Sequence, residues 1–215
     1  MYSFKLIPLL LKALHITLSL SILGMLLGLA VGILLTFIRL YKIPVLKQLA
    51  EIYISFFRGT PLLVQLFLLY FGLPQIFPLL KGMDAYTASL IGLGFNASAY
   101  IAEILRSSIS AIDKGQMEAS LSLGMSSFQG LYRIILPQAF RIAIPPLGNI
   151  FVDTVKGSSL AFTLGVVDIL ATAQMAAASS YKFFESYIIV ALLYWILILI
   201  FNFLQRKLEK KLSAY

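Results

Sequence analysis

The sequence predicts an all-α, polytopic membrane protein with five transmembrane helices. Of its 215 residues, 60% are hydrophobic and only 12% are charged, and the mean hydropathy is +0.94. A soluble domain of this size could not bury so much apolar surface, so the bilayer must solvate most of the chain. Several apolar runs are also long enough to cross a bilayer as helices, which takes about 20 residues each.

The composition argues against several functional classes. The formal net charge is +8, but the basic residues form no stripe on a soluble fold, so nucleic acid is not an expected partner. In membrane proteins, excess Lys and Arg mark cytoplasmic loops. The chain has no cysteine and a single histidine, His15. Disulfides, cysteine nucleophiles and metal sites are therefore not expected.

The first predicted span is the apolar run 13–38, which is longer than the apolar core of a signal peptide. Within it, Gly24, Gly28 and Gly32 recur every four residues and share one helix face. Small residues let another backbone approach closely. We expect this face to pack against helices of the same subunit, and a contact with another subunit is the alternative.

The second predicted span runs from about Leu49 to Leu73 and follows a basic connector at 39–47. It is interrupted at Phe57-Arg58-Gly59-Thr60-Pro61, where the proline removes a backbone hydrogen bond and should kink the helix. Arg58 is costly in lipid and should face protein, water or the cytoplasmic interface. A linker at 74–83 ends the segment.

The third and fourth predicted spans, at about 85–108 and 138–155, are too polar to face lipid on all sides. In the third, four polar residues recur at steps of four, three and four, so they share one helix face. In the fourth, Pro145-Pro146 marks a kink or a new start. The residues of the shared face are Asn96, Tyr100, Glu103 and Ser107, and the fourth span carries Asn149, Asp153 and, at its end, Lys156.

The region 157–186 is rich in small residues and contains Asp168, so we expect a short re-entrant or interfacial segment there. The last span, 187–204, ends at a basic tail. Basic residues are concentrated in that tail, in the 39–47 connector and around the loop at 109–136. With five spans, the positive-inside rule places the N-terminus outside and the loop and the C-terminus in the cytoplasm.

The loop at about 109–136 is a polar island in an otherwise apolar chain, and its sequence predicts two short helices. Asp113 can cap the first helix, and Gly124 can end it in a left-handed conformation. Ser126 or Ser127 can cap the second, which should end before Pro137 because the residue before a proline avoids helix. Such an exposed helix pair is either a docking element or simply a structured loop.

The island resembles a known signature. Glu118-Ala119-Ser120, three residues, Gly124, nine residues, Ile134, one residue and Leu136-Pro137 match the EAA motif of ABC importer permeases in spacing, with Ser120 where a second alanine is usual. Three further blocks resemble the polar amino-acid uptake family, and the resemblance covers almost the whole chain. These blocks are Phe57 to Leu62, Ala99 to Arg106, and Lys156 to Leu160.

The resemblance implies a single permease domain, 1–215, with the type I ABC importer permease fold, in a prokaryotic inner or plasma membrane. Its partners would be two copies of a nucleotide-binding ATPase subunit, a second permease (expected to be a second copy of this chain, in a homodimer), an external solute-binding protein and an amino-acid substrate. The chain has no GxxxxGK[ST] loop, so ATP and Mg would bind to the partner ATPase and not to this non-catalytic subunit. The coupling residues would be Gly115, Glu118, Ala119, Ser120, Gly124, Ile134, Leu136 and Pro137.

Ionisable and polar residues inside spans are substrate-site candidates because placing them there is costly. Two carboxylates in the pathway favour a basic amino acid such as arginine or lysine, and histidine or glutamine comes next. The competing interpretation is structural, namely Asp153–Lys156 and Glu103–Arg106 salt bridges. The candidates are Asn96, Ser98, Tyr100, Glu103, Asp153, Lys156, Ser158 and Ser159.

Two other functional classes remain as alternatives. An ion-gradient-driven secondary transporter usually has more spans and internal repeats than this sequence shows. An intramembrane enzyme would need a catalytic constellation, but the chain has no cysteine and its acidic residues are scattered.

Overall fold

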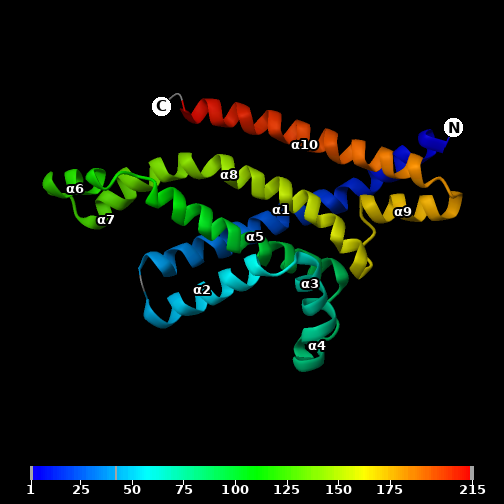
Figure 1. Ribbon diagram of the computed structural model, residues 1–215, viewed down its shortest axis with the longest axis horizontal. Coiled ribbons are helices and arrows are strands. Elements are labelled where there is room, and N and C mark those ends of the chain that lie inside the picture. The colour runs from blue at the N-terminus through cyan, green and yellow to red at the C-terminus, as the bar shows by residue number, and fades with distance from the viewer. Residues whose placement is uncertain (1, 42, 214–215) are drawn as a thin grey trace.

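The computed structural model describes residues 2–41 and 43–213, and these residues form helices and turns without a strand. Four long helices dominate the molecule and run along its length (Figure 1). The predicted all-α fold class is confirmed. The long helices are α1 (Tyr2–Leu40), α5 (Ala85–Ser110), α8 (Leu136–Gly157) and α10 (Phe183–Ser213).

Within the described residues, four helical segments are long and apolar enough to cross a membrane, and a bent helix pair raises the number to five. The five predicted spans are thus reached only when this bent pair, 44–76, counts as one. The first span is longer than predicted. Helix α1 begins at Tyr2 and not at Ala13, so Lys5 and Lys12 are also helical.

The glycine face of α1 packs against α5 of the same chain, as expected. A Cβ at Gly28 would lie 2.9 Å from the Cβ of Ala97, and a Cβ at Gly32 would lie 2.7 Å from Cγ2 of Ile101. These distances are shorter than real Cβ contacts, so only glycine permits this approach. The close packing of α1 on α5 forms the centre of the molecule.

The second span is bent far more sharply than a proline kink. Helix α2 (Pro44–Gly59) and the segment formed by α3 (Leu62–Phe67), a π-helical turn (Leu68–Gly72) and α4 (Leu73–Ile76) meet at 114°. The chain leaves the helical conformation at both Thr60 and Pro61, which are extended. The prediction of a linker from Pro74 is also wrong, because Pro74 fits the first turn of α4.

The island forms the two predicted helices, α6 (Lys114–Ser122) and α7 (Ser127–Gly130). The side chain of Asp113 accepts a hydrogen bond from the Gly115 N–H at 2.8 Å, and Gly124 has a left-handed φ of 81°. Ser126 caps α7 through a reciprocal capping box with Gln129. The predicted capping and termination signals are confirmed.

The prediction that the second island helix ends before Pro137 is wrong. Residues Ser127–Leu164 form one continuous helical segment, in which a π-helical turn (Leu131–Ile135) joins α7 to α8. The N–H of Leu136 bonds to the carbonyl of Leu131, five residues back. This wider turn lets the helix pass Pro137, which lies in the first turn of α8 and needs no N–H partner there. Pro145 and Pro146 also lie inside α8 and start no new helix.

The region after α8 holds two short elements, a 3₁₀ helix (Ser158–Leu164) and α9 (Ile169–Ser180). The 12 residues of α9 are too few to cross a bilayer. Asp168, which is fully buried, caps α9 by accepting from the Ala171 N–H at 2.8 Å. Helix α9 packs with the N-terminal part of α1 and with α10 around a cluster of buried apolar side chains.

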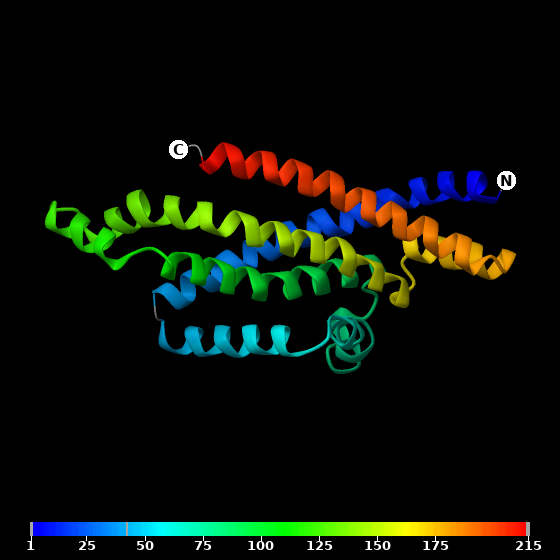
Figure 2. The same cartoon turned by 45° about the horizontal axis from the view of Figure 1, so that its top comes forward.

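The N-terminus and α9 lie at one end of the molecule, and α6 and α7 lie at the other (Figures 1 and 2). Helix α10 runs back from α9 toward the end that holds α6 and α7 (Figure 2). The island and the C-terminal part of α10 therefore point the same way. That this end faces the cytoplasm stays a prediction from the distribution of basic residues.

Candidate functional site

A polar cavity lies between α5, α8 and the start of α3. Its volume is about 260 Å³, below the ~300–1,000 Å³ of pockets that take drug-sized ligands, so it suits a small metabolite. Three of the predicted substrate residues, Asn96, Tyr100 and Asp153, line it. The other lining residues are Leu62, Leu93, Ala97, Ile150 and Thr154.

The bend between α2 and α3 fixes one wall of this cavity. The Nε2 of Gln65 donates to the carbonyls of Phe57 and Thr60 at 2.9 and 3.0 Å, which holds the extended residues in place. Its Oε1 accepts from Nδ2 of Asn96 at 2.9 Å. Gln65 thus joins the helix break to the polar face of α5. The sequence pattern missed this role because Gln65 and Asn96 lie on different helices.

Asp153 lines the cavity from α8 and is the charged residue of its lining. Its Oδ1 lies 2.7 Å from Nζ of Lys156, one helical turn along α8. Both side chains are more than half exposed, so this pair is accessible to a ligand and is worth little to stability. The predicted Asp153–Lys156 contact is present, but only Asp153 lines the cavity.

Three predicted site residues bond to their own surroundings and do not line the cavity. Ser98 is fully buried and shares a hydrogen bond of 2.8 Å with the hydroxyl of Tyr53. Ser158 is also fully buried and donates to the carbonyl of Val155. Ser159 donates to the carbonyl of Lys156.

Glu103 lies in a separate cluster in which three arginines surround it. Arg39 of α1 donates to Oε1, while Arg106 of α5 donates to Oε2 from Nη2 at 3.0 Å and from Nε at 3.2 Å. Arg58 of α2 lies 3.7 Å from the same Oε2. The Glu103–Arg106 pair is therefore present as one part of a larger network, which joins three helices through a carboxylate that is only 20% exposed.

Arg58 connects this cluster to the cavity. Its guanidinium carbon lies 5.8 Å from the ring centroid of Tyr100, close enough for a cation–π contact, and Tyr100 lines the cavity. In the sequence, the only indication of this role was an arginine beside a helix break inside a span.

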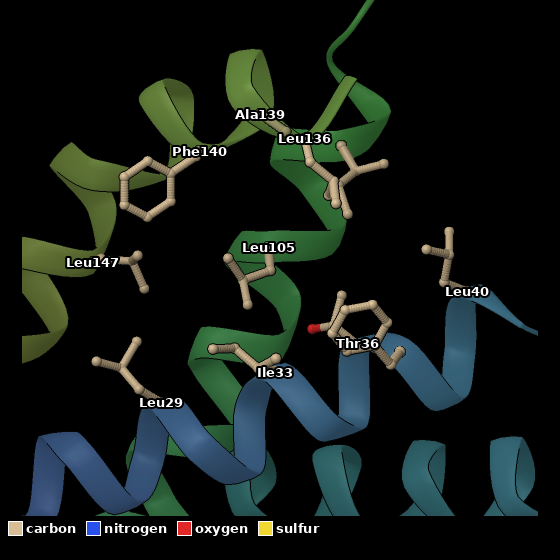
Figure 3. A pocket seen from close by; sticks show the side chains of 11 residues that line it. Leu29, Ile33, Thr36, Leu40, Leu105, Leu136, Ala139, Phe140 and Leu147 are labelled. Carbon is tan, nitrogen blue, oxygen red and sulfur yellow. The ribbon is translucent and has the colours of Figure 1, made fainter. Parts of the chain in front are cut away.

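A second cavity of about 260 Å³ lies between α1, α5 and α8 and has a different character (Figure 3). Its lining is apolar apart from Thr36, whose hydroxyl donates to the carbonyl of Gly32 at 2.8 Å. Figure 3 shows leucine, isoleucine and phenylalanine side chains pointing into it from all three helices. It offers no group to orient a polar substrate.

The island presents exposed side chains beyond the end of the bundle. Glu118 and Ala119 are exposed, as are the apolar side chains of Leu123 and Phe128. Ser120 is instead buried, and a Cβ at Gly130 would lie 2.5 Å from its Oγ. The small size of Ser120 therefore lets α6 and α7 pack together. Ile134 is partly buried and Pro137 is exposed near the base of the island.

Comparison with known proteins decides the family. Residues 6–214 match the family described as the inner membrane component of binding-protein-dependent transport systems. The chain belongs to this family. It is thus a multi-pass inner-membrane protein and a permease subunit of an ABC importer, a class of subunit that is not catalytic.

Individual relatives cover nearly the whole permease. A probable amino-acid ABC transporter permease, PatM of Vibrio harveyi, is 53% identical over 99% of this chain and 95% of its own length. A probable amino-acid permease, YxeN of Bacillus subtilis (strain 168), is 50% identical over 96% of this chain and 92% of its own length. The crystal structure of an amino acid ABC transporter with histidines has a TM-score of 0.91 and 38% identity over 97% of this chain and 96% of that one.

Membership of this family implies three kinds of partner for the permease, namely an ATPase subunit, a substrate-binding protein and a second permease. Within the described residues, no group of three His, Asp or Glu side chains could hold a metal ion.

Proposed function

We propose that the permease forms half of the membrane path of an ATP-driven amino-acid importer. In the working complex, two copies of this chain pair with two copies of the ATPase subunit, and a solute-binding protein delivers the amino acid from outside. The island, on the cytoplasmic side, transmits closure of the ATPases to the helices. The support is the match to amino-acid permeases along the whole chain, together with an exposed helix pair at one end and a polar cavity inside.

The surface of α6 and α7 carries the coupling part of this proposal. Leu123 is 82% exposed, and Phe128 and Tyr132 are each 65% exposed. They lie just after α6, in α7 and in the π-helical turn that follows it, and α6 and α7 lie at the end of the molecule opposite α9 (Figure 1). Exposed apolar side chains on a structured polar loop mark a surface that a protein partner covers. Glu118 and Ala119 lie exposed on the adjoining helix α6, where Glu118 can make charged contacts to the same ATPase. Gly124 sets the angle between the helices. A Cβ at Gly115 would lie 2.7 Å from Oδ1 of Asp113, so glycine at this position leaves room for the Asp113 cap of α6.

The test is Leu123→Asp compared with Leu79→Asp. Leu79 is 95% exposed and lies in the segment that leads into the opposite end of α5, so both variants place a carboxylate on an exposed leucine. We expect tagged Leu123→Asp permease to lose the ATPase on purification and to lose ATP-dependent uptake, while Leu79→Asp retains the ATPase. Equal ATPase recovery with both variants would contradict docking through the island.

The cavity is the substrate part of the proposal. Asn96, Tyr100 and Asp153 supply an amide, a phenol and a carboxylate within one small space, a combination suited to an amino acid. Asp153→Asn is expected to reduce uptake at least tenfold without changing ATPase recovery.

The identity of the amino acid is not fixed by family. Three relatives are 36–38% identical to this chain, each aligned over at least 88% of its own length. They are named as permeases for L-cystine and for arginine in Bacillus subtilis (strain 168), and for glutamine in Escherichia coli (strain K12). The expectation of a basic amino acid depended on two carboxylates free to bind it. Glu103 is instead held by arginines, and Asp153 is paired with Lys156.

A further inference from the structure

We propose that Arg58 binds the carboxylate of the substrate, and that the cavity consequently selects an amino acid with an uncharged side chain over arginine or lysine. This inference rests on the proposed function, because it takes the cavity lined by Asn96, Tyr100 and Asp153 as the substrate site.

Glu103 is not available to a substrate. Arg39 occupies Oε1, and Arg106 occupies Oε2 through two donors. A carboxylate that already accepts three charge-assisted hydrogen bonds has little capacity left for a substrate ammonium group. It is also only 20% exposed and does not line the cavity.

The same cluster has an excess of positive charge. Three guanidinium groups, those of Arg39, Arg58 and Arg106, surround the single carboxylate of Glu103, so this group of four side chains carries two uncompensated positive charges. Guanidinium groups remain charged in proteins. A cationic side chain brought into the adjoining cavity would be repelled by this excess, and a carboxylate would be attracted.

Arg58 is the member of the cluster that can reach a ligand. Its side chain is 46% exposed against 18% for Arg39. Arg106 is equally exposed, at 47%, but it lies 3.0 Å from Glu103, whereas Arg58 lies 3.7 Å away and is the more loosely held. It lies next to the helix break, and its guanidinium stands over the ring of Tyr100 at the cavity wall. A planar guanidinium in this position can bind a carboxylate through two parallel hydrogen bonds.

The cavity has a carboxylate in its lining, that of Asp153, and a cation just outside it, that of Arg58, and these two charges match the two charges of a zwitterion. Arg58 stands beside Tyr100, which rises from α5, and Asp153 lines the cavity from α8. A substrate carboxylate directed to Arg58 leaves its ammonium group to Asp153, whose partner Lys156 is more than half exposed and can move away. The side chain then meets Leu62, Leu93 and Ile150, which offer no countercharge to a second ammonium or guanidinium.

The experiment measures the binding of amino acids to the purified permease–ATPase complex. The binding protein is left out, so that the measured selectivity is that of the membrane subunits alone. The probes are radiolabelled glutamine, arginine, lysine and glutamate. We expect glutamine to bind at least tenfold more tightly than arginine or lysine. Arg58→Gln should weaken glutamine binding at least tenfold and should remove the preference against arginine.

Lys47→Gln is the matched control. Lys47 lies on the same helix, is 43% exposed and pairs with Glu51, so the variant removes one positive charge at similar exposure away from the cavity. It should bind glutamine within about twofold of the wild type. If Arg58→Gln does not yield folded complex, Arg58→Lys provides the second test, since it retains the charge but loses the two-pronged geometry and should still weaken binding.

The outcomes separate this inference from the proposed function. If no amino acid binds and Asp153→Asn leaves uptake unchanged, the cavity is not the substrate site. The substrate part of the proposed function and the role of Arg58 then both fail. If amino acids bind and Asp153→Asn weakens them, but arginine binds best or Arg58→Gln behaves like Lys47→Gln, the cavity stands and the role of Arg58 is overturned.

Discussion

At the scale of single residues, Glu103 shows how neighbouring charges change what a polar face can do. Its position on one face of α5 with Asn96 and Tyr100 follows from helical spacing. Its environment does not, because Arg39 and Arg58 come from α1 and α2. Spacing within one helix reveals the Arg106 contact but not the other two. The carboxylate therefore joins three helices, and removing it would leave three cations close together.

Replacing Glu103 by glutamine should lower both the stability of the permease and its transport activity. The amide keeps the shape but loses the countercharge, so we expect a loss of about 2 kcal/mol of stability, somewhat less than the ~3–5 kcal/mol of a fully buried pair. Uptake should fall because Arg58 loses one of its restraints. Thermal unfolding of the detergent-purified permease measures the first effect, and liposome uptake measures the second. A Glu103→Gln permease with wild-type melting temperature and uptake would show that the cluster has neither role.

Close packing at the glycines of α1 gives a graded prediction. The nearest atom to an added Cβ lies at 3.3 Å for Gly24, 2.9 Å for Gly28 and 2.7 Å for Gly32. The loss of stability on substitution by alanine should therefore increase from Gly24 through Gly28 to Gly32. At Gly32 it should reach about 1–3 kcal/mol, because the packed helices must separate. Melting temperatures of the three variants check the order. Gly24→Ala is the internal control, and equal effects at all three positions would contradict the intimate α1–α5 packing.

At the scale of elements, the sequence reveals what is local and misses what depends on several helices. The island helices, their caps and the left-handed glycine could all be predicted, since each signal lies within a few residues of the feature it controls. The 114° bend could not, because one proline permits anything from a kink to a break. The side chain of Gln65 stabilises the broken form through hydrogen bonds to Phe57, Thr60 and Asn96. The π-helical turn before Pro137 could not be predicted either, because a proline alone does not show whether the helix ends or continues past it.

The turn between α6 and α7 depends on the conformation of Gly124. Its φ of 81° is unfavourable for residues with a Cβ, and a Cβ there would meet nothing within 4 Å. Gly124→Ala should therefore cost about 1–2 kcal/mol of backbone strain alone. We expect the strain to shift the helices and to lower coupled ATP hydrolysis in the reconstituted importer severalfold. Gly124→Asn should retain more activity, because asparagine tolerates the left-handed region. If Gly124→Ala retained more activity than Gly124→Asn, backbone strain at this position could not be the cause of the lost ATP hydrolysis.

At the scale of the whole molecule, the chain leaves much apolar surface exposed and holds its polar cavity to one side. Many apolar side chains of α1, α8 and α10 are exposed, and the polar cavity lies on one side of α5. The island stands at one end, and α9 with the N-terminus stands at the other (Figure 1). This arrangement suits a subunit that completes its path with a second permease and is driven from the island end. The general architecture was predictable from hydropathy and motif spacing, whereas the charge network around Glu103 required the three-dimensional packing.

Mixing active and inactive copies tests whether the permease works as a homodimer with both islands engaged. Leu123→Asp supplies a copy that inserts but does not dock. When wild-type and variant chains are co-expressed equally, random pairing leaves about one quarter of the complexes with two intact islands. Uptake per permease should fall to about a quarter if both islands must be driven, because one idle ATPase contact stops the cycle. The measurement is uptake in liposomes reconstituted with differently tagged copies at known ratio. Uptake near one half would mean that each copy works independently or pairs with a different permease, and would contradict a homodimer in which both islands must be engaged.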